Sequence, residues 1–147
     1  MRILSAIMTL LFLVPATSQA DEKAELKKLA GNYKTIAMKL GGKNSLPSGL
    51  KFKITKLTVE KNQFILTISI NGQERKRPTT VKIDGSKTPK QIDFLKEDGT
   101  VISLGIYKLE GEKLTVCSQS KSEGRPKKFE SKAGSKSMVL IFERVKQ

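Results

Sequence analysis

Residues 64–83 read FILTISINGQERKRPTTVKI and indicate a β-hairpin. Every even position from 64 to 70 is apolar, whereas the odd positions include a threonine and a serine. Alternation with period two is typical of an antiparallel strand that has one face in the core and one in water. The dipeptide Asn71-Gly72 follows at once and tolerates the positive φ angles of a tight turn. Gln73 to Ile83 should therefore pair back onto the first strand, with Pro78 at a sheet edge or a bulge because proline has no N–H to donate.

The rest of the chain shows further short alternating segments after a short helix, which we expect at residues 21–29 with Asp21 as its cap. The alternating apolar residues are Ile92 and Phe94, then Ile102, Leu104 and Ile106, then Leu114 and Val116, and finally Met138, Leu140 and Phe142. Turns at Asp98-Gly99 and Glu110-Gly111 separate the middle segments. With residues 33–38 as the opening strand, the segments amount to about eight strands. Such strands joined by short turns favour an all-β, antiparallel up-and-down barrel over a sandwich.

Residues 52–59, FKITKLTV, break the alternation. The first two apolar residues of this segment stand at even positions and the last two at odd positions. A slip of one residue would turn the whole apolar set to the other face of the sheet. We therefore expect a bulge or a sharp bend near Thr55 or Lys56.

The first 20 residues have the features of a secretory signal peptide. Arg2 precedes an apolar run at residues 6–14, and Ser18-Gln19-Ala20 supplies the small residues of a cleavage site. The run is too short to span a bilayer, which takes roughly 20 apolar residues. We expect residues 1–20 to be removed and residues 21–147 to form one domain. The product should be secreted or periplasmic and should not span a membrane.

Several segments resemble a known family. Residues 29–34, LAGNYK, are similar to the opening Gly-x-Trp strand of lipocalin-like barrels, with tyrosine in place of tryptophan. The segments 89–93 (PKQID) and 104–117 (LGIYKLEGEKLTVC), together with Arg125, Pro126 and Phe129, resemble the small secreted lipocalin-like domain that is abundant in planctomycete bacteria. The resemblance covers residues 29–144. It implies a barrel fold and an extracytoplasmic location, but it implies no activity.

The resemblance also implies a structural contact between the two ends of the domain. In lipocalins the aromatic residue of the first strand lies across the closed end of the barrel, and an arginine of the last strand packs over it. Gly31, Tyr33 and Arg144 match these places. A cation–π contact there contributes about 0.5 to 2 kcal/mol, so we expect a structural clasp and not a functional site.

The composition excludes several classes of enzyme. The chain has 28 basic and 14 acidic side chains, a single cysteine and no histidine. Without histidine it lacks the usual base of a catalytic triad and the commonest zinc ligand. Cys117 lies in an apolar segment with no histidine to activate it, so we expect a buried, inert thiol. We expect no enzymatic activity, no metal and no other cofactor.

Three other polar groups have a structural interpretation. Asp93 lies between apolar residues of a strand, and a structural ion pair is a better expectation than a general base. Glu97 and Asp98 belong to a turn, where acidic residues serve backbone geometry. Residues 41–43, Gly-Gly-Lys, lack the pattern of a phosphate-binding loop and are interpreted as a loop at one end of the barrel.

Two functions remain open. The first is a binding module with a small hydrophobic ligand inside the barrel. Its candidate residues are Arg125 and Phe129 at the barrel mouth, where Phe129 could instead fill the core, and the inward even-numbered residues Phe64, Leu66, Ile68, Ile102, Leu104, Ile106 and Leu140. The second is a cationic interaction protein that docks an anionic envelope polymer, a protein or a membrane surface. We expect a monomer, no nucleic-acid partner and a positive charge that acts as a diffuse field.

Overall fold

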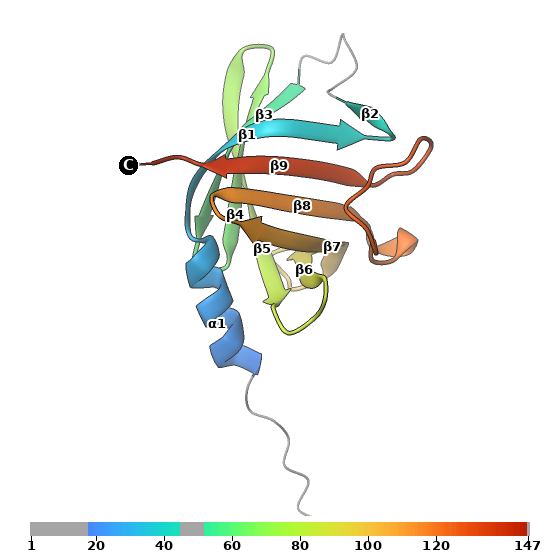
Figure 1. The fold of residues 1–147 in the computed structure, drawn as a ribbon. Helices are drawn as coiled ribbons and strands as arrows, with labels where there is room; N and C mark the ends of the chain where they lie inside the picture. Colours follow the sequence, from blue (N-terminus) through green and yellow to red (C-terminus); the bar gives the residue numbers. More distant parts are fainter. Residues whose placement is uncertain (1–17, 45–51, 147) are drawn as a thin grey trace, which may run out of the picture.

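A computed structural model describes residues 18–44 and 52–146 of the chain (Figure 1). Most of the expected signal peptide therefore lies outside the described residues. The elements are α1 (Ser18–Leu29), β1 (Gly31–Leu40), β2 (Lys43–Asn44), β3 (Phe52–Glu60), β4 (Gln63–Ile70), β5 (Gln73–Asp84), β6 (Lys90–Leu95), β7 (Val101–Glu110), β8 (Lys113–Ser120), the short 3₁₀ helix η1 (Lys121–Glu123) and β9 (Met138–Arg144). The helix begins three residues before the predicted start, so Asp21 stands in its first turn and is not its cap.

The strands form a closed antiparallel barrel. Each strand from β3 to β9 pairs with the next one in sequence, and β1 pairs with both β3 and β9. Eight strands make the wall, because β2 pairs only with the last two residues of β1. The predicted eight-stranded up-and-down barrel is confirmed.

The hairpin of β4 and β5 has the predicted turn and projects beyond the rest of the wall (Figure 1). Asn71 and Gly72 have φ angles of 52° and 80°. The pairing of β4 with β5 runs from the turn to Thr80, but the pairing of β5 with β6 starts only at Thr80. Residues 73–79 of β5 therefore form an edge in the described part of the chain. Pro78 lies on this edge, as expected, and falls at a non-hydrogen-bonded position when the rungs are counted from the turn.

The bulge predicted in β3 is also confirmed. The register between β3 and β4 shifts between Ile54 and Lys56, which leaves Thr55 without a partner residue in the ladder. The Thr55 hydroxyl donates a hydrogen bond to the Thr67 carbonyl at 3.2 Å. Because of the extra residue, Ile54 and Leu57 are both buried in the core.

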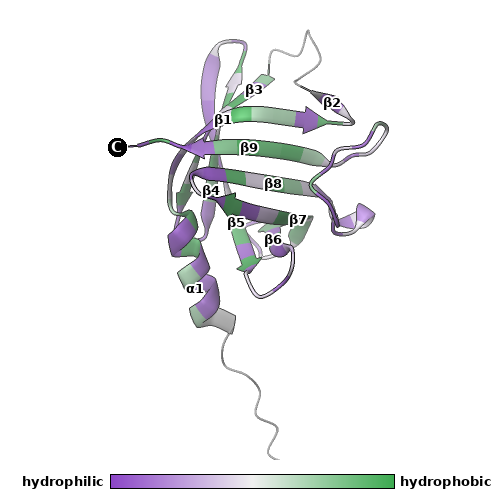
Figure 2. Ribbon diagram, in the orientation of Figure 1, coloured by the Kyte–Doolittle hydropathy of each residue, from purple (hydrophilic) through white to green (hydrophobic). Residues whose placement is uncertain are grey.

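The main core fills the barrel and reaches α1. Its largest fully buried side chains include Tyr33, Leu57, Ile92, Tyr107 and Phe142. The helix contributes Leu26 and Leu29 to this core. Figure 2 shows the mostly hydrophobic β9 and the hydrophilic outer part of the β4–β5 hairpin.

The expectation for β7 is wrong. We expected the even-numbered residues to face inward, but Tyr107 belongs to the main core and Ile106 to a second cluster on the outer side of the wall. Leu104 lies on that same outer face of the strand. This strand is apolar on both faces because residues 121–137 fold back over its outer surface, so the alternation could not identify the inner face. Ile102 is an exception, since a bulge opposite Phe94 and Leu95 displaces it from the regular pairing.

Candidate functional site

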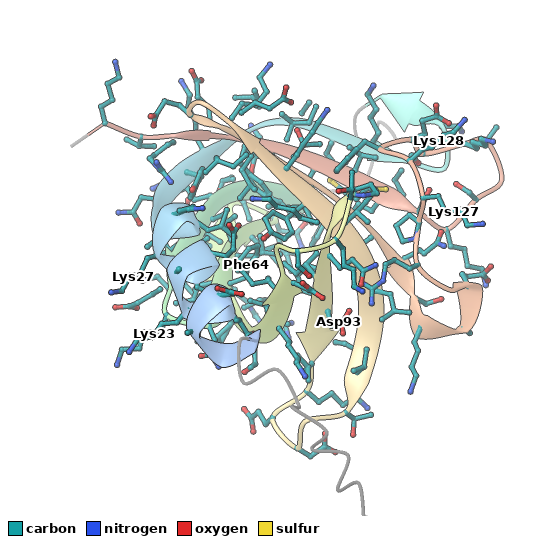
Figure 3. All side chains as sticks on the ribbon, turned by 60° about the horizontal axis from the view of Figure 1, so that its bottom comes forward. Lys23, Lys27, Phe64, Asp93, Lys127 and Lys128 are labelled. Atoms are coloured by element: carbon teal, nitrogen blue, oxygen red, sulfur yellow. The ribbon has the colours of Figure 1, made fainter. Side chains whose placement is uncertain are left out.

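A half-open cavity of about 190 Å³ lies inside the barrel. The described residues that line it are mostly apolar and none is ionisable: Phe64, Leu66, Thr79, Phe94, Ile102, Ser103, Val116, Ser118, Met138, Leu140 and Phe142. Phe64 and Phe94 meet edge to face, with their ring centroids 6.1 Å apart. Figure 3 shows Phe64 inside the barrel. Three hydroxyl groups are the only hydrogen-bonding side chains among these lining residues.

A more open groove of about 610 Å³ adjoins this cavity. It lies between residues 78–80 of β5 and residues 95–98 at the end of β6 and the following turn. Thr79 and Ile102 line both the groove and the cavity, so the two spaces are adjacent at these residues. The groove exists because β5 separates from β6 before Thr80.

The structure brings together only some of the predicted ligand-binding residues. Phe64 and Leu66 line the cavity. Ile68 is buried on the same face of β4, one step closer to the hairpin turn. Leu104 and Ile106 do not line the cavity because they are on the outer face of β7.

Arg125 lies on the outer wall and not at the barrel mouth. One nitrogen of its guanidinium donates hydrogen bonds to the carbonyls of Ile92 and Gly105 at 3.2 and 2.8 Å. The other donates to the Asp93 carboxylate at 2.7 Å. The expected ion pair of Asp93 is confirmed, and Arg125 is the partner that the sequence could not name. This side chain fastens residues 121–137 to β6 and β7.

Phe129 also packs outside the barrel. It covers the second cluster, which consists of Ile106, Cys117 and Val139. The ammonium group of Lys108 lies 4.8 Å from the centre of the Phe129 ring. Phe129 is not at the barrel mouth, where we expected it, because the outer faces of β7, β8 and β9 are apolar here. Residues 121–137 bury these faces instead of crossing the mouth.

Cys117 is buried beneath this covering segment. Its thiol faces the Glu130 carbonyl, with 3.7 Å between sulfur and oxygen. Burial raises the pKa of the Cys117 thiol. An unreactive thiol is the expected consequence.

The predicted contact of Tyr33 with Arg144 is present. The guanidinium carbon lies 5.3 Å from the ring centre. A nitrogen of Arg144 donates hydrogen bonds to the Tyr33 hydroxyl at 2.8 Å and to the Lys28 carbonyl at 2.6 Å, and the Tyr33 hydroxyl donates to the Leu29 carbonyl at 2.7 Å. A side chain at Gly31 would touch Arg144, since an added Cβ would lie 3.5 Å from its Nε. The contact joins β1, β9 and the end of α1.

Glu25 docks α1 on the barrel. Its carboxylate accepts hydrogen bonds from Lys28, Lys90 and Tyr107 at 2.9 to 3.1 Å. Burial alone would raise the pKa of Glu25, but these hydrogen bonds outweigh burial and the pKa is lower than usual. Burial, together with the charge of Glu25, raises the pKa of Tyr107. The network is structural, because it lies outside the cavity lining.

Two arginines beside the cavity are not among the predicted ligand-binding residues. Arg75-Lys76-Arg77 is a compact basic cluster, but we expected it to act only as part of the diffuse charge. The register pairs Arg77 with Leu66 and Arg75 with Ile68, so both arginines belong to the inner face of the hairpin. Counting back from the turn at Asn71-Gly72 would have found them.

Other kinds of site find no support within the described residues. No group of three or more acidic, histidine or cysteine side chains there could hold a metal ion. No helix in the same part of the chain is long and apolar enough to cross a membrane. Three comparisons, with protein-family models, with curated proteins and with solved structures, find no match to this chain.

Proposed function

We propose that the protein is a binding module, not an enzyme, and that it holds one small apolar ligand in the barrel cavity. The observation that supports this proposal is the lining of the 190 Å³ cavity, which combines apolar side chains with three hydroxyl groups. Ligand sites have this composition, with a few polar groups among many apolar ones. The lining has no ionisable side chain for acid–base or nucleophilic chemistry.

The volume limits the ligand. Sites for drug-sized molecules occupy roughly 300–1,000 Å³, and this cavity is smaller. An engineered apolar cavity of about 150 Å³ accepts benzene. The buried part of the ligand should therefore be a single aromatic ring or a short alkyl chain.

A series of neutral n-alcohols from butanol to decanol tests the proposal by isothermal titration calorimetry. Each added methylene should raise the affinity about fourfold while the chain still fits inside the cavity. The gain should stop at roughly six to eight carbons, where the cavity is filled. Ser118→Phe should weaken hexanol binding because the new ring occupies the cavity, whereas Ser122→Phe, on exposed η1, should not. Equal binding to both variants would reject the cavity as the site.

The location and the family are part of the same proposal. We infer that the mature protein is a secreted or periplasmic monomer of the planctomycete lipocalin-like family. The eight-stranded barrel and the contact of Tyr33 with Arg144 support this inference. N-terminal sequencing of the protein from its host should begin at Asp21, and a cytosolic protein that retains Met1 would contradict it.

A further inference from the structure

Two arginines lie on the inner face of the projecting hairpin. The pairing of β4 with β5 has no register shift, so side chains alternate regularly along β5. Thr79 lines the cavity and Val81 is buried in the core, which fixes the odd-numbered residues as the inner set. Arg75 and Arg77 belong to this set. Lys76 belongs to the outer face, opposite Thr67.

Arg77 is next to the cavity. It is the direct cross-strand neighbour of Leu66, which lines the cavity, and it precedes Thr79 by one step on the same face. Side chains of directly paired residues start about 5 Å apart, and an arginine side chain is longer than that distance. Arg75 occupies the next position outward, beside Ile68. Neither arginine lines the cavity itself, but both lie on the face of the hairpin that continues outward from it.

The two other arginines among the described residues, Arg125 and Arg144, serve the structure. Only five of the 28 basic residues are arginines. Arg125 and Arg144 each contact a carboxylate and backbone carbonyls. Arg75 and Arg77 are exposed, and no other described residue makes an ion pair or a side-chain hydrogen bond with them. The planar guanidinium group suits two-point recognition of a carboxylate or a phosphate better than lysine does.

We propose that the natural ligand is a small anionic amphiphile, whose apolar group fills the cavity and whose carboxylate or phosphate is held by Arg75 and Arg77. This inference rests on the proposed function and names the class of its ligand. The apolar part is limited by the cavity to about one ring or a short chain. The anionic part stays at the rim, where it keeps contact with water.

The other bank of the groove bears mixed charge. Lys96, Glu97 and Asp98 line it, and the Asp98 carboxylate accepts a hydrogen bond from the Thr100 N–H at 2.8 Å. None of these residues lines the cavity. Lys96 offsets one of the two acidic groups, so this side carries a net charge of −1, whereas Arg75 and Arg77 give the inner face of the hairpin two positive charges, and an anion is favoured there.

Hexanol, heptanoate and hexyl phosphate separate the two parts of this ligand, because all three carry the same six-carbon alkyl chain. With the unmodified protein at low salt, heptanoate or hexyl phosphate should bind about tenfold more tightly than hexanol. The better of the two anions identifies the acidic group. Arg75→Gln with Arg77→Gln should remove this preference, so that the two anions bind no more tightly than hexanol.

The matched control removes the same charge from the outer face. Lys56 of β3 and Lys76 of β5 both pair with Thr67 of β4, so Lys56→Gln with Lys76→Gln removes two charges from the outer face of the sheet beside the arginines. This control should keep the preference for the anions within about twofold, since exposed charges act weakly at a distance. An equal loss in both double variants would reject a site at the two arginines. Hexanol binding without any preference for the anions would reject the anionic ligand but keep the proposed function, whereas no binding of any of the three compounds would reject both.

Discussion

The Tyr33 hydroxyl connects three parts of the chain at the scale of single atoms. It donates to the last carbonyl of α1 and accepts from Arg144 on β9, while its ring lies under the guanidinium group. The residue that carries this hydroxyl is fully buried. A buried polar group that loses its partner costs about 1–3 kcal/mol. The hydroxyl therefore matters as much as the ring, a point that the resemblance to a tryptophan position does not convey.

Tyr33→Phe tests this contribution. The variant keeps the ring but removes the hydroxyl, which bonds to the Leu29 carbonyl and to one guanidinium nitrogen of Arg144. We expect the free energy of unfolding in urea to fall by about 1–3 kcal/mol, without a change in hexanol binding. Glu112→Gln is the control, because the exposed Glu112 carboxylate is 3.9 Å from Arg144 and such pairs contribute about 0–1 kcal/mol. Equal losses in the two variants would contradict the role of the hydroxyl.

The residues of the candidate site differ in how well the sequence predicts them. Phe64 and Leu66 were found because their strand alternates cleanly and ends in a recognisable turn. The same turn fixes the faces of Arg75 and Arg77, so their place was available from local sequence. The place of Arg125 could not be predicted from local sequence, because its partners lie 20 to 33 residues away. The contact with them depends on how residues 121–137 fold back.

At the scale of elements, residues 121–137 act as a cover for the outer face of β7, β8 and β9. Alternation assumes that one face of a strand is wet. Here Ile106 and Cys117 are buried on the outer face by this cover, and Tyr107 is buried on the inner face. A strand with two apolar faces carries no period-two signal, which is why the inner face of β7 was assigned wrongly. The bulge in β3 was predictable because Lys53 and Lys56, on the outer face of this strand, are exposed to water.

Arg125→Ala tests how the cover is held. The substitution removes the hydrogen bonds to the Ile92 and Gly105 carbonyls and the ion pair with Asp93. We expect a loss of about 1–3 kcal/mol in the free energy of unfolding. Cys117 should also react faster with a thiol reagent in the native protein, because the cover opens more often. Lys127→Ala, at an exposed position in the same segment, should change neither value. Unchanged labelling of Cys117 in Arg125→Ala would show that other contacts hold the cover.

The attachment of α1 should weaken in acid. The pKa of Glu25 is lowered in the folded protein, so the folded state favours the charged carboxylate. This contribution to stability is fully present above the unfolded pKa, about 4.3, and is lost as the pH falls through the lower folded pKa. In urea unfolding at a series of pH values, Glu25→Gln should be less stable than the unmodified protein at pH 7. The difference should shrink below about pH 4.3. A difference that stays constant with pH would show that the charge of Glu25 does not hold the helix.

At the scale of the whole molecule, closure of the barrel follows from the sequence, but the size of its cavity does not. Eight strands with short turns predict the wall, since the hairpin and turn signals are local. The volume left inside depends on how side chains of several strands meet. Phe64 and Phe94, for example, occupy space from opposite ends of their strands. The groove opens because β5 pairs with β6 over a shorter stretch than with β4. The local sequence does not give the lengths of these pairings.

The net charge is also a property of the whole molecule. The formal net charge is +14. Lysines of this charge are spread widely: Figure 3 shows Lys23 and Lys27 of α1 on one side and Lys127 and Lys128 of the cover on the other. Such a distribution attracts an anionic surface from many directions. We therefore expect the retention of the protein on an anionic column to depend on its total charge.

Chromatography on an anionic column distinguishes this diffuse attraction from the ligand site. Retention should be strong at low salt and mostly lost near 0.15 M, roughly physiological ionic strength, where the Debye length is about 8 Å. Arg75→Gln with Arg77→Gln and Lys56→Gln with Lys76→Gln remove equal charge, so both double variants should elute earlier by the same amount. The two variants should differ only in the binding of heptanoate or hexyl phosphate, because only the arginines lie on the inner face beside Leu66 and Ile68. If the arginine variant alone lost retention, the hairpin would be a docking site for anionic polymers, and the cationic interaction function would replace the small ligand.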